Sequence, residues 1–223
     1  MKKQSLAAAF LAGALVLSSC GASNAVKGAG IGAAGGAGIG AGIGRVLGNT
    51  AVGAVVGGVV GGTAGTLIGK KMDKQKKELE RDVKDAKIES VNDGQAIRVT
   101  FDSGILFATG SASLSSTSQA TLRKFAANLS EHSDTDLMII GHTDNTGTDR
   151  VNNPLSYNRA TSVRSFLAGQ GVSSSRMKVE GKGSYEPVAD NSTVAGRREN
   201  RRVEVYILPS KEMVKAAQDG TLR

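Results

Sequence analysis

The feature that most constrains the fold of this chain is a four-residue glycine period within residues 25–69. Such spacing places the glycines along one side of a helix. Each glycine costs a helix in water about 1 kcal/mol relative to alanine, whereas in lipid a helix is needed to satisfy the backbone. Small residues at every fourth position also let two helices approach closely. The two sets are Gly28, Gly32, Gly36, Gly40 and Gly44, then Gly53, Gly57, Gly61, Gly65 and Gly69.

This pattern predicts a membrane-associated helical hairpin, here called the glycine zipper, over residues 25–69. Its turn would be formed by Arg45, Gly48, Asn49 and Thr50, and its second helix would end at the membrane surface with Lys70 and Lys71. Each arm is close to the ~17 residues that span a bilayer. A membrane oligomer or pore-like assembly, with the rest of the chain as wall anchor, is an alternative function. A flexible Gly/Ala linker is the structural alternative, although linkers are usually rich in serine and lack this period.

The N-terminus has the architecture of a secretory signal peptide over residues 1–19. Lys2 and Lys3 form a positive start, and the apolar run from Leu6 to Leu17 is too short to span a bilayer. Cleavage would remove two lysines and no acidic residue, which lowers the formal net charge of the 223-residue chain from +8 to +6. The residues therefore predict an exported protein.

Cys20 follows this segment and is the only cysteine in the sequence. Leu17-Ser18-Ser19-Cys20 resembles the bacterial lipobox, which implies that Cys20 is acylated, for example with palmitate, and begins a lipidated N-terminus over residues 20–24. A free thiol in an unprocessed segment is the alternative. By analogy with such lipoproteins, Gly21 favours the outer membrane, with the globular domain in the periplasm.

Two further segments differ in composition from the rest. Residues 70–90 alternate lysine with acidic residues, and a thin apolar stripe runs through Met72, Leu79 and Val83. They predict a charged helical linker, which at ~1.5 Å per residue would be roughly 30 Å long. Residues 209–223 are expected to be a polar tail.

Residues 91–208 have the composition of a globular domain. Alternation and short apolar runs predict strands, and apolar residues at helical spacing predict helices. Two β-α-β units, with a short helix or loop before the last strand, predict an α/β fold, an α+β sandwich of one sheet and one helical layer. The expected strands are 96–101, 137–140, 177–180 and 201–208, and the expected helices are 114–130 and 155–168.

Short blocks in this domain follow one another in a distinctive order. They are Gly141-His142-Thr143-Asp144-Asn145-Thr146-Gly147, Asn152, Leu155-Ser156, Arg159-Ala160, Gly181-Lys182-Gly183, Pro187-Val188-Ala189-Asp190-Asn191, Gly196-Arg197 and Asn200-Arg201-Arg202-Val203-Glu204. This order strongly resembles the OmpA-like domain, shared by OmpA C-termini, Pal lipoproteins and flagellar stator proteins, over about residues 95–208. The glycine segment followed by Met72-Asp73-Lys74-Gln75 also resembles lipoproteins of the YiaD type.

The resemblance implies non-covalent binding of peptidoglycan through the diaminopimelate of the stem peptide. It places an acid at Asp144 for the ammonium group and an arginine at Arg159 for the carboxylate. The chemistry is consistent, because diaminopimelate ends in one cation and one anion on the same carbon and arginine donates two parallel hydrogen bonds. The alternative is that Asp144 and Arg159 pair with each other as a surface salt bridge, worth about 0–1 kcal/mol.

Further contributors are expected around this pair. Thr146 and Asn152 are in the same loop, and Arg201 could add a second carboxylate contact. Gly110 stands where relatives often place a polar residue, so only backbone would be available there. Arg202 falls on the opposite face of its strand and is expected to be structural or solvated.

Other classes of function fit the sequence less well. The basic charge could suit nucleic acid, but the chain is 4% aromatic and has no groove-reading motif. No cofactor is expected. His142 has no second histidine or cysteine nearby to complete a metal site, so it is expected to order the loop, and His132 is expected to be exposed. No nucleophile–base pattern stands out, so binding is favoured over an enzyme.

Overall fold

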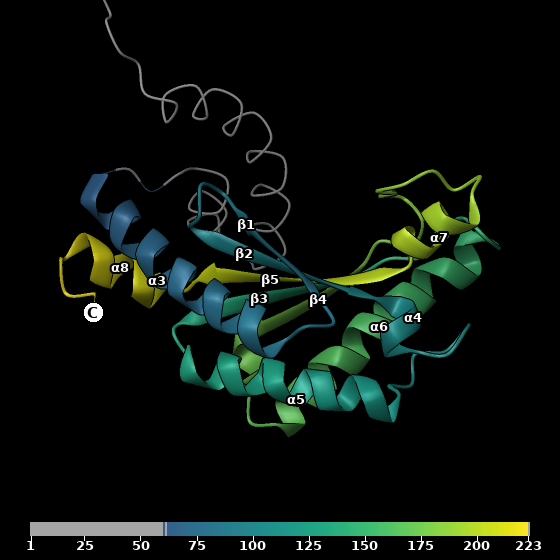
Figure 1. The fold of residues 1–223 in the computed structure, drawn as a ribbon, viewed down its shortest axis with the longest axis horizontal. Coiled ribbons are helices and arrows are strands. Elements are labelled where there is room, and N and C mark those ends of the chain that lie inside the picture. Colours follow the sequence, from purple (N-terminus) through teal and green to yellow (C-terminus); the bar gives the residue numbers. More distant parts are fainter. Residues whose placement is uncertain (1–59, 61, 223) are drawn as a thin grey trace, which may run out of the picture.

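The computed structural model describes residues 60 and 62–222. Their five-stranded sheet has the order β1-β2-β5-β3-β4 (Figure 1). Neighbouring strands are antiparallel except for the parallel pair β3–β4. The predicted mixed α/β class is confirmed, with one strand more than expected. The strands are β1 (Lys87–Val91), β2 (Ala96–Asp102), β3 (Thr135–Gly141), β4 (Met177–Gly181) and β5 (Arg202–Pro209).

Helices cover one face of this sheet, and α5 (Ser116–Glu131) and α6 (Asp149–Gly169) lie below it in Figure 1. Their apolar residues join those of β2, β3 and β5 in one core. Phe101 of β2 meets Phe125 of α5 edge to face, with ring centroids 5.5 Å apart. The Ser115 hydroxyl accepts a hydrogen bond from the Ser118 N–H and caps α5.

Helix α6 begins at Asp149, six residues before the predicted start. Its first turns carry Val151 as their one strongly apolar residue and also Pro154, so the apolar stripe that marks a helix is missing there. The short helix expected before the last strand is α7 (Val194–Asn200).

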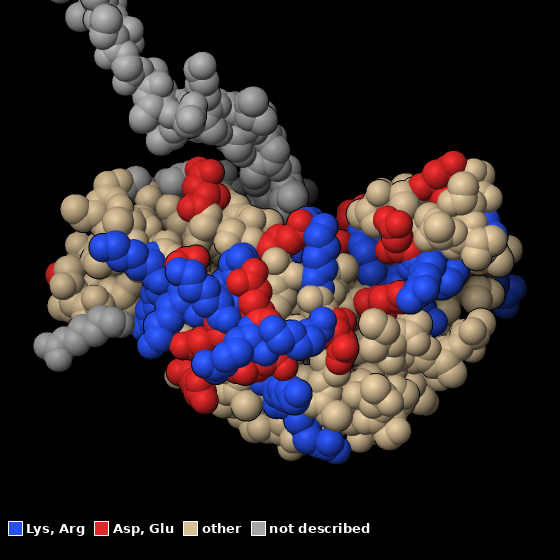
Figure 2. Space-filling model, viewed as in Figure 1, with Lys and Arg blue, Asp and Glu red and all other residues tan. Residues whose placement is uncertain are grey.

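Helix α3 (Gly62–Asp82) replaces the expected end of the glycine zipper. The prediction that a membrane helix ends at Lys70 and Lys71 is wrong, because α3 continues through both residues. Ile68 is fully buried in the core shared with α5, so this stretch packs on the domain. The outward face of α3 carries ion pairs four residues apart, and opposite charges intermingle on the face seen in Figure 2.

Strand β1 lies where the end of the charged helical linker was expected. Its five residues pair in antiparallel register with β2. The intervening turn has positive φ at Asn92, Asp93 and Gly94, of 56°, 51° and 81°. The two apolar residues of β1, Ile88 and Val91, are three positions apart and do not alternate, which hid the strand. The Asn-Asp-Gly sequence is the signal that could have revealed the hairpin.

The expected polar tail contains a helix, α8 (Lys211–Gln218). Ser210 caps its start, and Met213 and Ala217 are buried in the core that also holds α3. Two buried residues at i and i+4 are the short stripe of an amphipathic helix. The charged residues between them made the segment look like a tail.

The chain enters the domain beside the β1–β2 turn. The Val60 N–H donates to Gln95 Oε1 (3.0 Å), and Gln95 Nε2 donates to the Val60 carbonyl (3.1 Å). Gly62 has φ +70°, so the backbone turns sharply before α3 begins. A Cβ on Gly65 would lie 1.8 Å from the Val60 carbonyl oxygen. Two glycines of the predicted zipper therefore serve this entry, Gly62 through its positive φ and Gly65 through the close approach of the backbone.

The signal peptide, Cys20 and most of the glycine zipper lie outside the described residues. Between residues 60 and 222, as far as the structure describes them, no helix is both long and apolar enough to cross a membrane.

Candidate functional site

A pocket of about 460 Å³ opens at one end of the sheet's central strands. There β2 and β3 end and β5 begins, because Asp102 is paired with Arg202 and Gly141 with Val203. Helix α4 (Ser103–Leu106), the loop after β3 and the first turns of α6 form the walls. The structure brings together every described residue that was predicted to bind ligand, namely Asp144, Thr146, Asn152, Arg159 and Arg201, and Gly110 is beside them.

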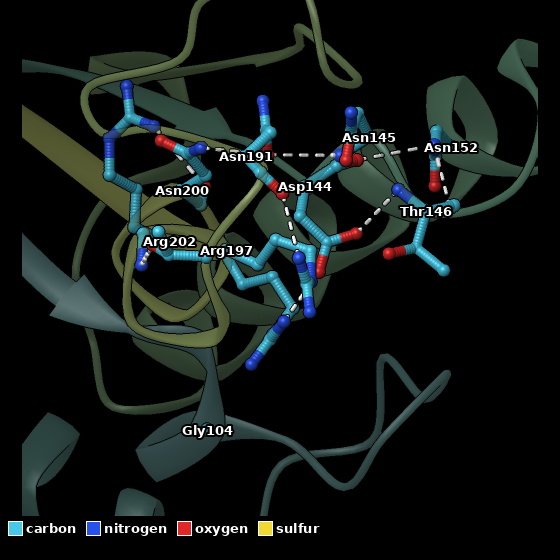
Figure 3. Close-up of polar contacts among 12 residues, drawn as sticks. Gly104, Asp144, Asn145, Thr146, Asn152, Asn191, Arg197, Asn200 and Arg202 are labelled. Carbon is cyan, nitrogen blue, oxygen red and sulfur yellow. Dashed lines mark hydrogen bonds and ion pairs between the residues drawn. The ribbon is translucent and has the colours of Figure 1, made fainter.

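Asp144 is held by two donors. Its Oδ1 accepts from the Thr146 N–H (2.8 Å), a contact that Figure 3 draws. Its Oδ2 accepts from Arg201 Nη1 (2.5 Å). Partial burial alone would raise the pKa of Asp144, but the hydrogen bonds from Arg201 and Thr146 outweigh it and lower that pKa. Asp144 is therefore a carboxylate at neutral pH.

Arg159 is only 3% exposed and projects from α6 into the pocket wall. Its Nε donates to the Ser111 carbonyl (3.0 Å), and its guanidinium lies 5.3 Å from the centre of the Phe107 ring. Its Nη1 is buried and has no hydrogen-bond partner. Burial and then the charge of Arg201 lower the pKa of Arg159, although Asp144 opposes this. A buried cation with an unused donor is suited to an anion.

The alternative in which Asp144 pairs with Arg159 is wrong, because the ion pair of Asp144 is with Arg201. Arg201 follows α7 and precedes β5, so it lies at the strand's entrance and not within the strand. Its side chain is 38% exposed and accessible from the pocket.

Asn152 and Thr146 play different parts in the loop. The Asn152 amide nitrogen donates to the carbonyls of Asp144 (3.3 Å) and Thr146 (3.1 Å), so it braces the loop from α6. Thr146 is exposed, and its N–H fixes the Asp144 carboxylate. Asn152 is therefore a positioning residue, whereas the Thr146 hydroxyl remains at the pocket surface.

Three residues of the quoted blocks support the site without having been predicted to do so. Buried Asn200 accepts from the N–H groups of Val188 and Ala189 and donates to Asn191, whose side chain accepts from the Asn145 N–H (Figure 3). Arg197 donates to the carbonyl of Asn191 and also lines the pocket. Their place in the sequence blocks was the signal that could have identified them, but only the fold shows which loop they hold.

Close backbone approach fixes α6 against the sheet. A Cβ on Gly141 would lie 2.0 Å from the Ser156 carbonyl oxygen, and one on Gly181 would lie 2.5 Å from the Tyr157 nitrogen. These glycines let the helix that carries Arg159 lie directly against β4 and against β3, the strand that leads to Asp144. Gly110 has φ +69° and presents only backbone to the pocket, as expected.

His142 is buried beneath the loop, and its Nε2 lies 3.9 Å from Glu204 Oε2. Burial and then the charge of Arg202 lower the pKa of His142 to about 4, so it is neutral at pH 7. Arg202 is itself buried and pairs with Glu204 at 2.7 Å, which makes it structural. The expectation of an exposed His132 is wrong, because it is 8% exposed and its Nε2 lies 2.6 Å from Glu78 of α3. Among the described residues, no group of three or more His, Cys, Asp or Glu could hold a metal ion.

The pocket thus presents one ionised acid and three arginines, Arg159, Arg197 and Arg201, on its walls. Asp144 is already neutralised by Arg201, and each of its oxygens has a second lone pair for another donor. Arg159 has no such counter-ion within 4 Å among the described residues. The arrangement can therefore receive a group that brings one anion to Arg159 and one cation to Asp144.

Comparison with known proteins finds two family profiles that match different parts of the chain. Residues 106–201 match the profile of the OmpA family, and residues 1–73 match that of the YMGG-like Gly-zipper. The probable lipoprotein YiaD of Escherichia coli (strain K12) is 36% identical over 138 residues, which are 62% of this chain and 63% of that protein. The peptidoglycan-binding protein ArfA of Mycobacterium bovis is 38% identical over 112 residues, or 50% of this chain and 34% of that protein. The matches therefore span less than two thirds of either relative.

One solved structure combines similar sequence with the same fold. It is described as the cell wall anchor of the T6SS from Pseudomonas aeruginosa, and it is 32% identical with a TM-score of 0.54. The similarity covers 60% of this chain and 96% of the other.

Proposed function

The C-terminal domain of this chain belongs to the OmpA family, and from that premise we propose that the protein tethers the outer membrane to peptidoglycan. In this proposal the domain binds the wall without cleaving it, through the diaminopimelate of the stem peptide. The single observation that carries the proposal is Arg159, a buried guanidinium with an unused donor in the same pocket as the ionised Asp144.

The ligand chemistry matches the charges in the pocket. The diaminopimelate carboxylate would accept from Arg159 Nη1, and Arg201 could share that anion. The neighbouring ammonium group would donate to Asp144, whose two oxygens retain free lone pairs. A wall in which lysine replaces diaminopimelate lacks this carboxylate, so Arg159 would stay without an anion.

The related proteins support the same class of function. The names printed for them are a lipoprotein, a peptidoglycan-binding protein and a cell wall anchor, and none is the name of an enzyme. Acylation of Cys20 would supply the membrane end of the tether. Incorporation of labelled palmitate that persists after Cys20→Ser would contradict that part of the proposal.

The pocket is tested by cosedimentation with purified sacculi. Asp144→Ala and Arg159→Ala should each weaken binding by roughly 10-fold or more, since charge-assisted hydrogen bonds contribute about 1.5–3 kcal/mol. Arg81→Ala is the matched control, because Arg81 is an exposed arginine in the last turn of α3, where it pairs with Asp82, and it does not line the pocket. Undiminished binding by both pocket variants, or equal binding to lysine-type and diaminopimelate-type sacculi, would refute the assignment.

A further inference from the structure

The face of the sheet turned away from α5 and α6 also carries a buried apolar cluster. The strand register pairs Met138 with Tyr206, and Ala96 and Leu208 adjoin the next pair, Ile97 with Ile207, so the cluster extends across three adjacent strands. None of its members is more than 7% exposed. We call it the second-face cluster, and it consists of Ala96, Met138, Ile140, Tyr206 and Leu208.

The described helices do not account for this burial. Their buried apolar residues belong to the core on the other face, and Val91 is the one partly buried hydrophobic residue of the described chain that packs against the second-face cluster. Apolar surface left in water costs about 25 cal/mol per Å². A cover for these side chains must therefore come from the part of the chain that precedes Val60, or from another molecule.

The position of Val60 favours the chain itself. Val60 is bound at both its N–H and its carbonyl to Gln95, which directly precedes Ala96 of the cluster. The sharp turn at Gly62 sends the following residues into α3 on the first face. The preceding residues therefore start from the end of the sheet where the second-face cluster begins.

Residues 46–59 have the length and pattern to cover it. Val52, Val55, Val56 and Val59 stand at i, i+3, i+4 and i+7, the stripe of a helix with one apolar face. The segment contains no charged residue. As a helix it would be about 21 Å long, whereas the three strands of the cluster span roughly 10 Å.

We propose that residues 46–59 fold back as a helix and dock their valine stripe on the second-face cluster of the same chain. The glycines between the valines permit the close approach. The stripe cannot pack on the sheet and in lipid at the same time, so docking competes with membrane insertion of the second zipper arm. The glycine-rich segment then has two alternative places, one on the domain and one in the membrane.

Cysteine cross-linking in the full-length chain tests the docking. Val52 lies seven residues before Val59, about 10 Å along a helix, which equals two strand spacings and reaches β3. We expect the variant with Val52→Cys and Met138→Cys to form an intramolecular disulfide. The matched control is Ala54→Cys with Met138→Cys, because Ala54 is on the opposite side of the helix. Met138→Cys alone reports any reaction with Cys20.

The outcomes separate the possible occupants. An intramolecular disulfide for position 52 at a yield at least about fivefold above position 54 supports docking. Equal yields, no disulfide, or only disulfide-linked dimers would overturn it, and dimers would identify a second copy as the cover. A second readout needs no substitution: peroxide should oxidise Met138 as slowly as Met177 of the other core, and oxidation at the rate seen in urea would also overturn the proposal.

Discussion

At the scale of single residues, the pocket separates a carboxylate that is already paired from a guanidinium that is not. Asp144 keeps its charge because Arg201 and the Thr146 N–H lower its pKa. The Nη1 group of Arg159 has no hydrogen-bond partner, because this side chain is buried and Asp144 is paired with Arg201 instead. The site is therefore prepared for an anion before any ligand arrives, and this makes its dependence on pH predictable.

Sacculus binding should be constant from pH 8 to pH 5 and should fall only below about pH 4. The pKa of Asp144 in the folded protein is lower than its usual value of 3.8, so the carboxylate is protonated only below that pH. Cosedimentation across this range measures the effect, with circular dichroism to confirm folding. Asp144→Asn should bind weakly and without this acid transition, and loss of binding already at pH 6 in the unsubstituted chain would contradict the assignment.

His142 should make the stability of the domain depend on pH in a higher range. Its folded pKa of about 4 is lower than the 6.5 of an unfolded histidine, so the unfolded state binds more protons between these values. The free energy of unfolding should fall by about 3 kcal/mol as pH decreases through this window. Urea titrations at several pH values measure it, and His142→Leu should flatten the dependence. An equally steep slope in that variant would assign the effect to other groups.

The sequence allowed the members of the site to be predicted better than their contacts. Asp144 and Arg159 stand in blocks whose order can be read directly. The partner of Asp144 is 57 positions away, and no local pattern distinguishes Arg201 from Arg159 as that partner. The bracing role of Asn152 was missed for the same reason, since it depends on where α6 starts.

At the scale of elements, the close contact between α6 and the strands β3 and β4 determines the shape of the pocket. Gly141→Ala should destabilise the domain and weaken sacculus binding together, because the new Cβ would meet the Ser156 carbonyl at 2.0 Å and push α6 away. Gly169→Ala is the control, because Gly169 lies in α6 and a Cβ there would have no neighbour within 4 Å. Thermal unfolding and cosedimentation should show a loss of roughly 1–3 kcal/mol for the first variant only.

The elements that sequence reasoning missed are those whose pattern depends on a distant partner. Strand β1 lacks an apolar alternation and α8 has only two buried residues, so neither gives a strong local signal. Strand β3, a run of buried apolar residues, and α5, with its serine cap, needed no such partner and were predicted with small shifts at their ends.

At the scale of the whole molecule, the division between anchor and domain falls earlier than the glycine pattern suggested. Deletion of residues 25–59 should leave sacculus binding within about twofold of that of the full-length chain, because the pocket lies at the end of the sheet opposite Val60. Deletion of residues 25–69 should also remove the buried Ile68 and lower stability by about 2–5 kcal/mol. Chemical denaturation of both variants distinguishes them, and equal stability would mean that the first turns of α3 contribute nothing.

The pocket and Val60 lie at opposite ends of β2, a strand of seven residues and therefore roughly 20 Å long. In the proposed tether, one end is pulled by the wall and the other by the membrane. Tension would then act along the strand axis, and β1 and β5 hold β2 on both sides through hydrogen bonds perpendicular to that axis. Both ladders would then share the load in shear. No single hydrogen bond would carry the whole force when the envelope swells.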